Sequence, residues 1–256
     1  MYLLFSGEGP SDLGSCVNQQ PFAEGADFSH GPLAQLCDQI FERILGYSTL
    51  EIDGSYGFLD ERAVVASGNA NRPQKGLKVR RRDDDAGDDE ETGFFFSNAR
   101  LLARFALKLA AEKQTDVVAI LFRDDDATQS VGRATWDRKR RSMLDGFRRE
   151  GFTAGVPMIP KPKSEAWFLC ALRQQPYQHC EFLEDESGND NSPRSLKALL
   201  EVILGCPATR EELTERVRAG EVDSDRIDMP SFVVFRTRFR AALRSPTTPH
   251  WGQSHE

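Results

Sequence analysis

The chain has 256 residues, of which 39% are hydrophobic and 29% charged, and its formal net charge at pH 7 is −7. No apolar run approaches the roughly 20 residues that a membrane span requires, and Met1 to Glu8 lacks the basic segment of a secretion signal. We therefore expect a globular cytoplasmic protein with no membrane association. The negative net charge argues against a protein that coats nucleic acid non-specifically. A local basic groove that binds nucleic acid would still be compatible with this charge.

Cysteine usage indicates no zinc site. The five cysteines form no Cys-x-x-Cys pair, so they predict reduced, buried thiols rather than a zinc centre. They are Cys16, Cys37, Cys170, Cys180 and Cys206.

The first predicted strand is the apolar run from Tyr2 to Phe5, and a glycine-rich turn follows it. The turn reads Ser6-Gly-Glu-Gly-Pro-Ser-Asp12 and carries Glu8 at its centre. Glycine permits positive φ or a close approach of the backbone to a ligand, and Ser11 or Asp12 is expected to cap a short helix. Taken in isolation, Glu8 is more often an ordinary surface acid.

Helical spacing from Leu33 to Ile44 predicts a packing helix that ends at Gly46. A strand is expected around residues 62–66. Residues 71–92 form a basic block followed by an acidic block, which predicts a flexible, solvated loop. Ser97 or Asn98 is expected to cap a second helix that runs to Lys113.

The most informative stretch is the apolar run from Val117 to Phe122, which is typical of a strand buried on both faces of a parallel sheet. It leads directly into Asp124, Asp125 and Asp126. Alternation along an extended chain points Asp124 and Asp126 to one side and Asp125 elsewhere. Ligands gather at the carboxyl ends of such strands, and a hard divalent cation such as Mg²⁺ would resolve the repulsion of the two carboxylates. A solvated acidic loop is the alternative.

Residues 134–150 predict a helix with seven basic against three acidic side chains, counting Arg133. Such a helix is commonly a solvated face, but it could also contact a phosphate backbone. The basic residues favoured for that contact are Arg138, Lys139, Arg140 and Arg141.

A strand at 152–159 then delivers Pro160-Lys-Pro-Lys-Ser-Glu-Ala-Trp167, in which Ser164 is expected to cap a helix. Lys163 and Glu165 are candidate site residues there. Alternatively, Lys163 is an ordinary loop lysine and Glu165 is an acid that complements the helix dipole.

The C-terminal part predicts helices at 195–204, 210–218 and 230–243, and the last of these carries a basic stripe that includes Arg236 and Arg240. We divide the chain into a catalytic α/β domain (1–175, with 71–92 inserted), a helical appendage (176–244) and a tail (245–256).

Two of these motifs resemble the Toprim superfamily, the catalytic domain of topoisomerases, DnaG-type primases and nucleases of the overcoming-lysogenization-defect group. Leu3 to Asp12 is similar to its strand–glycine–Glu motif, and Ile120 to Asp126 to its strand–Asp-x-Asp motif. Pro160 to Trp167 resembles a segment of small bacterial Toprim-like proteins. The resemblance covers roughly residues 1–170 and implies a mostly parallel sheet flanked by helices.

The resemblance also implies a metal-dependent nuclease that acts on nucleic acid, with DNA favoured over RNA. Mg²⁺ or Mn²⁺ would be held by Glu8, Asp124 and Asp126, with Glu165 completing the site and Lys163 neutralising the scissile phosphate. Glu8 could alternatively act as a general acid/base. Relatives of this type often work beside an ATPase, so we expect such a partner and a role in anti-phage defence.

Two other functions fit the same residues. Asp124-Asp-Asp-Ala-Thr128 satisfies the Asp-x-Asp-x-Thr motif of haloacid-dehalogenase-like phosphatases, in which Asp124 would be the nucleophile. The chain could instead be a non-catalytic adaptor, which the acidic charge and the distance from the Asp pair to Gly132 favour.

Overall fold

Helices and strands alternate along most of the chain. The computed structural model describes residues 1–18, 20–61, 92–125, 133–189, 192 and 195–245. Its elements, in chain order, are β1 (Tyr2–Gly7), β2 (Gly14–Cys16), β3 (Phe22–Glu24), η1 (Gly25–Asp27), β4 (Phe28–His30), α1 (Pro32–Leu45), β5 (Tyr56–Asp60), α3 (Gly93–Lys113), β6 (Val117–Phe122), α4 (Arg133–Arg149), β7 (Gly155–Met158), α5 (Ser164–Leu172), η2 (Cys180–Asp185), α6 (Leu196–Leu204), α7 (Arg210–Arg218) and α8 (Pro230–Arg244).

The main sheet has five strands in the order β3-β5-β1-β6-β7. All neighbouring pairs are parallel except β3 and β5, which are antiparallel. Every residue of β1 and of β6 is buried, which is why both strands appear as continuous apolar runs in the sequence. The predicted α/β fold with a mostly parallel sheet flanked by helices is confirmed.

The strand order reverses between β1 and β6. From β1 the chain moves outward to β5, then crosses to the other side of β1 to form β6 and continues to β7. The two strands end level, because Gly7 lies opposite Phe122 in their register. Such a reversal opens a crevice at the carboxyl ends of the strands, so the residues that follow Gly7 and Phe122 are brought together there.

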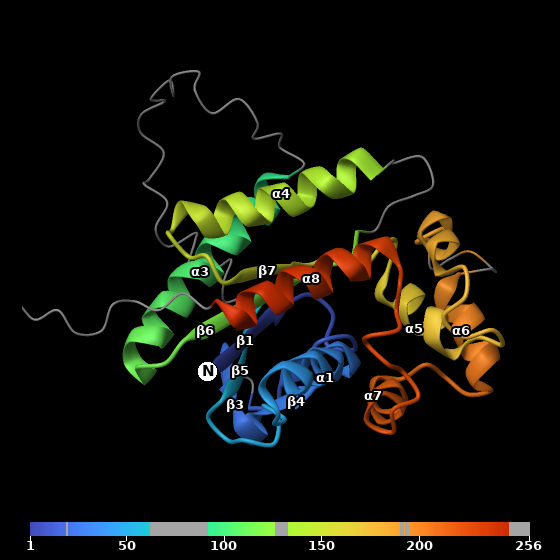
Figure 1. The fold of residues 1–256 in the computed structure, drawn as a ribbon, viewed down its shortest axis with the longest axis horizontal. Coiled ribbons are helices and arrows are strands. Elements are labelled where there is room, and N and C mark those ends of the chain that lie inside the picture. The colour runs from blue at the N-terminus through green and yellow to red at the C-terminus, as the bar shows by residue number, and fades with distance from the viewer. Residues whose placement is uncertain (19, 62–91, 126–132, 190–191, 193–194, 246–256) are drawn as a thin grey trace, which may run out of the picture.

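Helices cover both faces of the sheet (Figure 1). On one face α3 packs against α4, with contacts to β6 and β7. On the other, α8 packs against β7 and α1, while α7 packs on α1. Right-handed crossovers require this separation, because the chain leaves β1 in one direction and later passes it in the other. Across the described residues, every helix falls short of the length and hydrophobicity that a bilayer span requires.

The C-terminal helix α8 belongs to the same hydrophobic core as the sheet. Its buried Phe232 and Phe235 pack on Trp167 of α5, with ring centroids 4.8 and 5.8 Å from the indole. The indole Nε1 donates to the hydroxyl of Ser231 at 3.0 Å. The predicted helical appendage is therefore fastened to the α/β part by buried aromatic contacts.

Several local predictions differ from the structure. No helix follows Ser11 and Asp12, because the Asp12 carboxylate accepts hydrogen bonds from the Ser11 and Ser164 hydroxyls, and β2 comes next. The predicted strand at residues 62–66 lies outside the described residues, whereas β5 at Tyr56–Asp60 was not predicted. The second helix begins at Gly93, ahead of the expected cap at residues 97–98.

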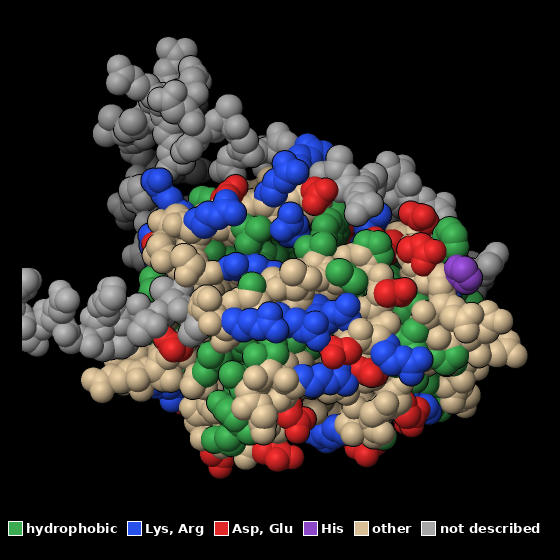
Figure 2. All heavy atoms as spheres, in the orientation of Figure 1, with side chains coloured by type: hydrophobic (Ala, Val, Ile, Leu, Met, Phe, Trp, Pro, Cys, Tyr) green, Lys and Arg blue, Asp and Glu red, His purple; other side chains and the backbone are tan. Residues whose placement is uncertain are grey.

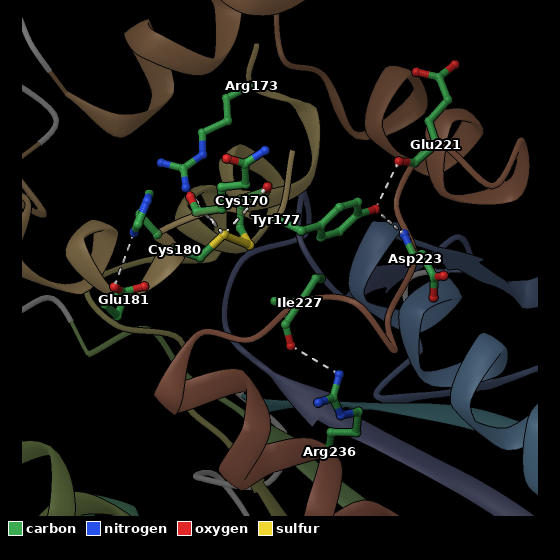
Figure 3. The surroundings of a disulfide bond; sticks show 11 residues. Cys170, Arg173, Tyr177, Cys180, Glu181, Glu221, Asp223, Ile227 and Arg236 are labelled. Carbon is green, nitrogen blue, oxygen red and sulfur yellow. Dashed lines mark hydrogen bonds and ion pairs between the residues drawn. A yellow bond between two sulfur atoms is a disulfide. The ribbon is translucent and has the colours of Figure 1, made fainter. Parts of the chain in front are cut away.

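The prediction of reduced thiols is wrong for Cys170 and Cys180, which form a disulfide between α5 and η2 (Figure 3). The segment between them turns back on itself, and the amide of Tyr177 donates to the carbonyl of Cys170 at 2.7 Å. This turn brings the two Cα atoms to 5.2 Å, a separation that sequence spacing does not reveal. Cys16, Cys37 and Cys206 are free thiols, as expected, but only Cys37 is also buried as predicted.

Replacing Phe235 tests whether α8 and the sheet fold as one unit. We expect Phe235→Ala to lower the free energy of unfolding by about 3–5 kcal/mol, because a buried aromatic ring leaves a cavity against Trp167. Thr237→Ala on the exposed side of the same helix should change it by less than about 0.5 kcal/mol. Urea unfolding followed by tryptophan fluorescence and circular dichroism measures both. If the wild type shows a separate early unfolding transition that Phe235→Ala does not change, α8 and the sheet do not fold as one unit.

Candidate active site

Glu8 and Asp124 meet at the strand reversal, as the positions of their motifs predict. Glu8 directly follows β1, and Asp124 lies two residues after β6. The backbone amide of Asp124 donates to Glu8 Oε1 at 3.2 Å. The Glu8 side chain retains 32% of its surface exposed, so this carboxylate lies at the crevice but is open to solvent.

The N-terminus of α5 holds the Asp124 carboxylate. The amide of Ser164, the first residue of α5, donates to Asp124 Oδ1 at 3.0 Å. The first amides of a helix have no partners within the helix, and the helix dipole favours a negative charge at this end. Loops after β1, β6 and β7 therefore converge on two carboxylates.

Ser164 also connects Asp124 to a third carboxylate. Its buried hydroxyl donates to Asp12 rather than capping α5, and Lys163 occupies the N-cap position instead. Burial raises the pKa of the Asp12 carboxyl, an effect that exceeds the opposing influence of the Ser164 hydroxyl and of Lys163. Ser164 thus links the turn after β1 to the loop after β6.

Arg123 places a positive charge beside Glu8. Its Nη2 lies 3.1 Å from Glu8 Oε2, while its Nε and Nη2 form a fork with the two carboxylate oxygens of Glu61 at 3.0 Å each. The guanidinium carbon lies 4.1 Å from the ring centroid of Phe94. One guanidinium, on a side chain that is 17% exposed, is therefore shared by two carboxylates.

Asp125 points away from this network, as the alternation of an extended chain predicts. Its carboxylate is 2% exposed and accepts from Lys139 Nζ at 2.9 Å, and its carbonyl accepts from the same nitrogen at 2.5 Å. Lys139, predicted to contact nucleic acid, is thus engaged with a buried acid and is only 12% exposed. Asp126 lies outside the described residues.

The other predicted nucleic-acid-binding residues on α4 differ in their surroundings. Arg140 lies 3.8 Å from the Asp137 carboxylate and over the ring of Trp136. Arg138 donates to Thr135 Oγ1 at 3.3 Å, and Arg141 is exposed. The exposed side of α4 therefore retains basic groups that could meet an anion.

The arginines of α8 contribute to a band of basic side chains on the face seen in Figure 2. Arg236 Nη1 donates to the carbonyls of residues 224, 225 and 227 at 2.6, 2.8 and 3.1 Å. Arg240 forms an ion pair with Asp225. Both predicted binding residues of α8 therefore contact the loop that precedes this helix.

The two remaining candidates flank the start of α5. Lys163 precedes the helix, and its charge acts on Asp12. Glu165 is half-buried in the first turn. Within the part of the chain that the structure describes, the one three-residue group with ligand atoms close enough for a metal is Cys170, Cys180 and Asp228. Its two sulfurs are joined in the disulfide, so it is not a metal site.

The donor chemistry at the strand reversal is nevertheless suited to a hard cation. Glu8 and Asp124 offer carboxylate oxygens, the ligands that Mg²⁺ and Mn²⁺ prefer. Their loops are held in place by backbone hydrogen bonds from neighbouring elements. A cation here would be held by Glu8 and Asp124, and the described residues near them add the positive charge of Arg123.

Neither protein-family models, nor curated proteins, nor solved structures yield a match to this chain. The resemblance to the Toprim superfamily therefore stays a prediction that rests on the motifs themselves. Four residues of the site were not predicted as site residues: Asp12, Glu61, Arg123 and Ser164. Asp12, Arg123 and Ser164 stand inside the motifs, so their position was the available signal, whereas Glu61 lies in no motif.

The raised pKa of Asp12 predicts a pH dependence of stability. Between the ordinary Asp pKa of about 4 and the raised value, folded Asp12 keeps a proton that the unfolded chain has released. The free energy of unfolding should therefore fall as the pH rises through this range. Asp12→Asn should remove this dependence. The free energy of unfolding of the variant should therefore increase relative to that of the wild type as the pH rises.

Urea unfolding at several pH values measures the difference. The exposed Asp185→Asn serves as the control and should follow the wild type. A difference between Asp12→Asn and wild type that is the same at every pH would contradict the assignment.

Removing Lys139 tests its role as the partner of a buried acid. Lys139→Ala leaves the Asp125 carboxylate buried and unpaired, so we expect a loss of about 3–5 kcal/mol in the free energy of unfolding. Arg141→Ala, on an exposed position of α4, should cost less than about 0.5 kcal/mol. Equal, small effects in thermal and urea unfolding would refute the role of Lys139 in the fold.

Proposed function

We propose that this protein is a metal-dependent nuclease that hydrolyses phosphodiester bonds of nucleic acid, with DNA the favoured substrate. The observation that carries the proposal is the convergence of Glu8 and Asp124, from adjacent parallel strands, at the carboxyl end of the sheet. Acids placed at a strand reversal suit a site that handles phosphate through a bound cation.

The residues would divide the work as follows. Glu8 and Asp124 would hold Mg²⁺ or Mn²⁺, which supplies a hydroxide at neutral pH and offsets charge on the phosphoryl oxygens. Asp126 and Glu165 are further candidate ligands. Lys163, next to the α5 N-terminus, would neutralise the scissile phosphate. Ser164 keeps Asp124 in place through its amide.

Nucleic acid would approach over the basic groups of α4, where Arg138 and Arg141 lie on the exposed side. Phosphate contacts of this kind position the substrate without reading its sequence. An ATPase partner and a role in anti-phage defence belong to the same proposal and rest on the resemblance to Toprim nucleases.

A non-catalytic adaptor is the second candidate, and one observation favours it. Arg123 forms ion pairs with both Glu8 and Glu61 within the protein, so these acids also make sense as structural ion pairs. A phosphatase of the haloacid-dehalogenase type, with Asp124 as nucleophile, is the third candidate and predicts turnover of small phosphate esters.

Cleavage of plasmid, single-stranded DNA and RNA with Mg²⁺ or Mn²⁺ separates these functions. We expect wild-type cleavage to depend on the metal and to fall about 100-fold or more in Glu8→Gln and in Asp124→Asn, because each removes a charged ligand of the cation that would stabilise the transition state. The exposed Asp185→Asn is the matched control and should retain full activity.

The other outcomes also decide between the candidates. Cleavage that survives both substitutions would refute the site. Wild-type protein that neither cleaves nor binds Mn²⁺ would favour the adaptor, and turnover of phosphate esters without nuclease activity would favour the phosphatase.

A further inference from the structure

A chain of contacts leads from the candidate metal site to the start of α3. Arg123 touches Glu8 and forms a fork with Glu61. Glu61 Oε1 in turn accepts from Nδ2 of Asn98 at 2.6 Å. Asn98 is 1% exposed, and the Glu61 side chain is 14% exposed. These groups are therefore withdrawn from solvent, where charges interact more strongly than in water.

The positive charge of Arg123 has two effects on Glu8. It keeps the carboxylate oriented, but it also repels any cation that Glu8 would bind. The fork with Glu61 is the stronger attachment, since it uses two guanidinium nitrogens and contacts both carboxylate oxygens. Glu61 thus offsets most of the guanidinium charge, and Asn98 fixes Glu61 for that task.

We infer that Glu61 is a positioning residue that sets the cation affinity of Glu8 by balancing the charge of Arg123. This inference rests on the proposed metal-dependent function. It assigns a role in that function to a carboxylate that does not itself touch the cation. Outer partners of metal ligands typically change metal affinity by about 10–100-fold when they are altered.

The inference predicts opposite effects for the two halves of one ion pair. Glu61→Gln removes the balancing charge, so Arg123 faces Glu8 uncompensated and Mn²⁺ binding should weaken about tenfold. Arg123→Gln removes the repelling charge and leaves Glu61 ionised, so binding should tighten about tenfold. The double variant should lie close to the wild type.

Isothermal titration of the full-length protein with Mn²⁺ at low ionic strength measures these affinities without requiring catalysis. Glu150→Gln is the matched control. Glu150 pairs with Arg100 and Arg104 at 2.7 and 2.8 Å and is 15% exposed, so it loses the same charge from another arginine pair. Circular dichroism confirms that each variant is folded, and Asn98→Ala offers a milder route to weakened binding if Glu61→Gln does not fold.

Each outcome decides the question. Opposite shifts, with an unaltered Glu150→Gln, support the role of Glu61. If both single variants weaken binding, or neither changes it, while Glu8→Gln abolishes it, the ion pair is structural and the inference is overturned although the metal site stands. If the wild type binds no Mn²⁺, the proposed function and the inference fall together.

Discussion

The structure depends on the direct parallel pairing of β1 with β6. These two strands are buried at every residue and end level with each other. Because the chain passes from one side of β1 to the other between β5 and β6, the loops after β1 and β6 are forced together at the crevice. Everything that defines the candidate active site follows from that pairing, since Glu8 and Asp124 are each fixed within two residues of a buried strand.

Negative charge concentrated at one crevice requires compensation, and the protein supplies it in separate ways. Asp124 receives a helix N-terminal amide, Glu8 receives a guanidinium, and Asp125 is directed to a buried lysine. Asp12 instead accepts hydrogen bonds from the hydroxyls of Ser11 and Ser164, and burial raises the pKa of its carboxyl. The acids therefore differ in their exposure to solvent. Among the site acids that are paired with a basic group, Glu8 is the most exposed.

The C-terminal region holds α5 in position. The helix α5, which presents Ser164 to Asp124, is packed through Trp167 against the phenylalanines of α8. Its other end is joined to η2 by the disulfide (Figure 3). The region predicted as an appendage is thus part of the framework that holds the loop after β7, and the arginines of α8 contact neighbouring backbone carbonyls.

The sequence by itself determined the elements whose hydrophobic pattern is local: the buried strands at Tyr2 and Val117, and the helices of α1, α7 and α8. It also located Glu8 and Asp124, because an apolar run that ends in a turn acid marks a strand end. Only the tertiary structure decided the surroundings of these acids. Ser164 contacts Asp124, and Glu61 and Asn98 are connected to Glu8 through Arg123. A contact between residues distant along the chain depends on strand order, which leaves no periodic trace in the sequence. The same reason explains the disulfide and the short strands β2 to β5, which gain their stability from pairing rather than from their own residues.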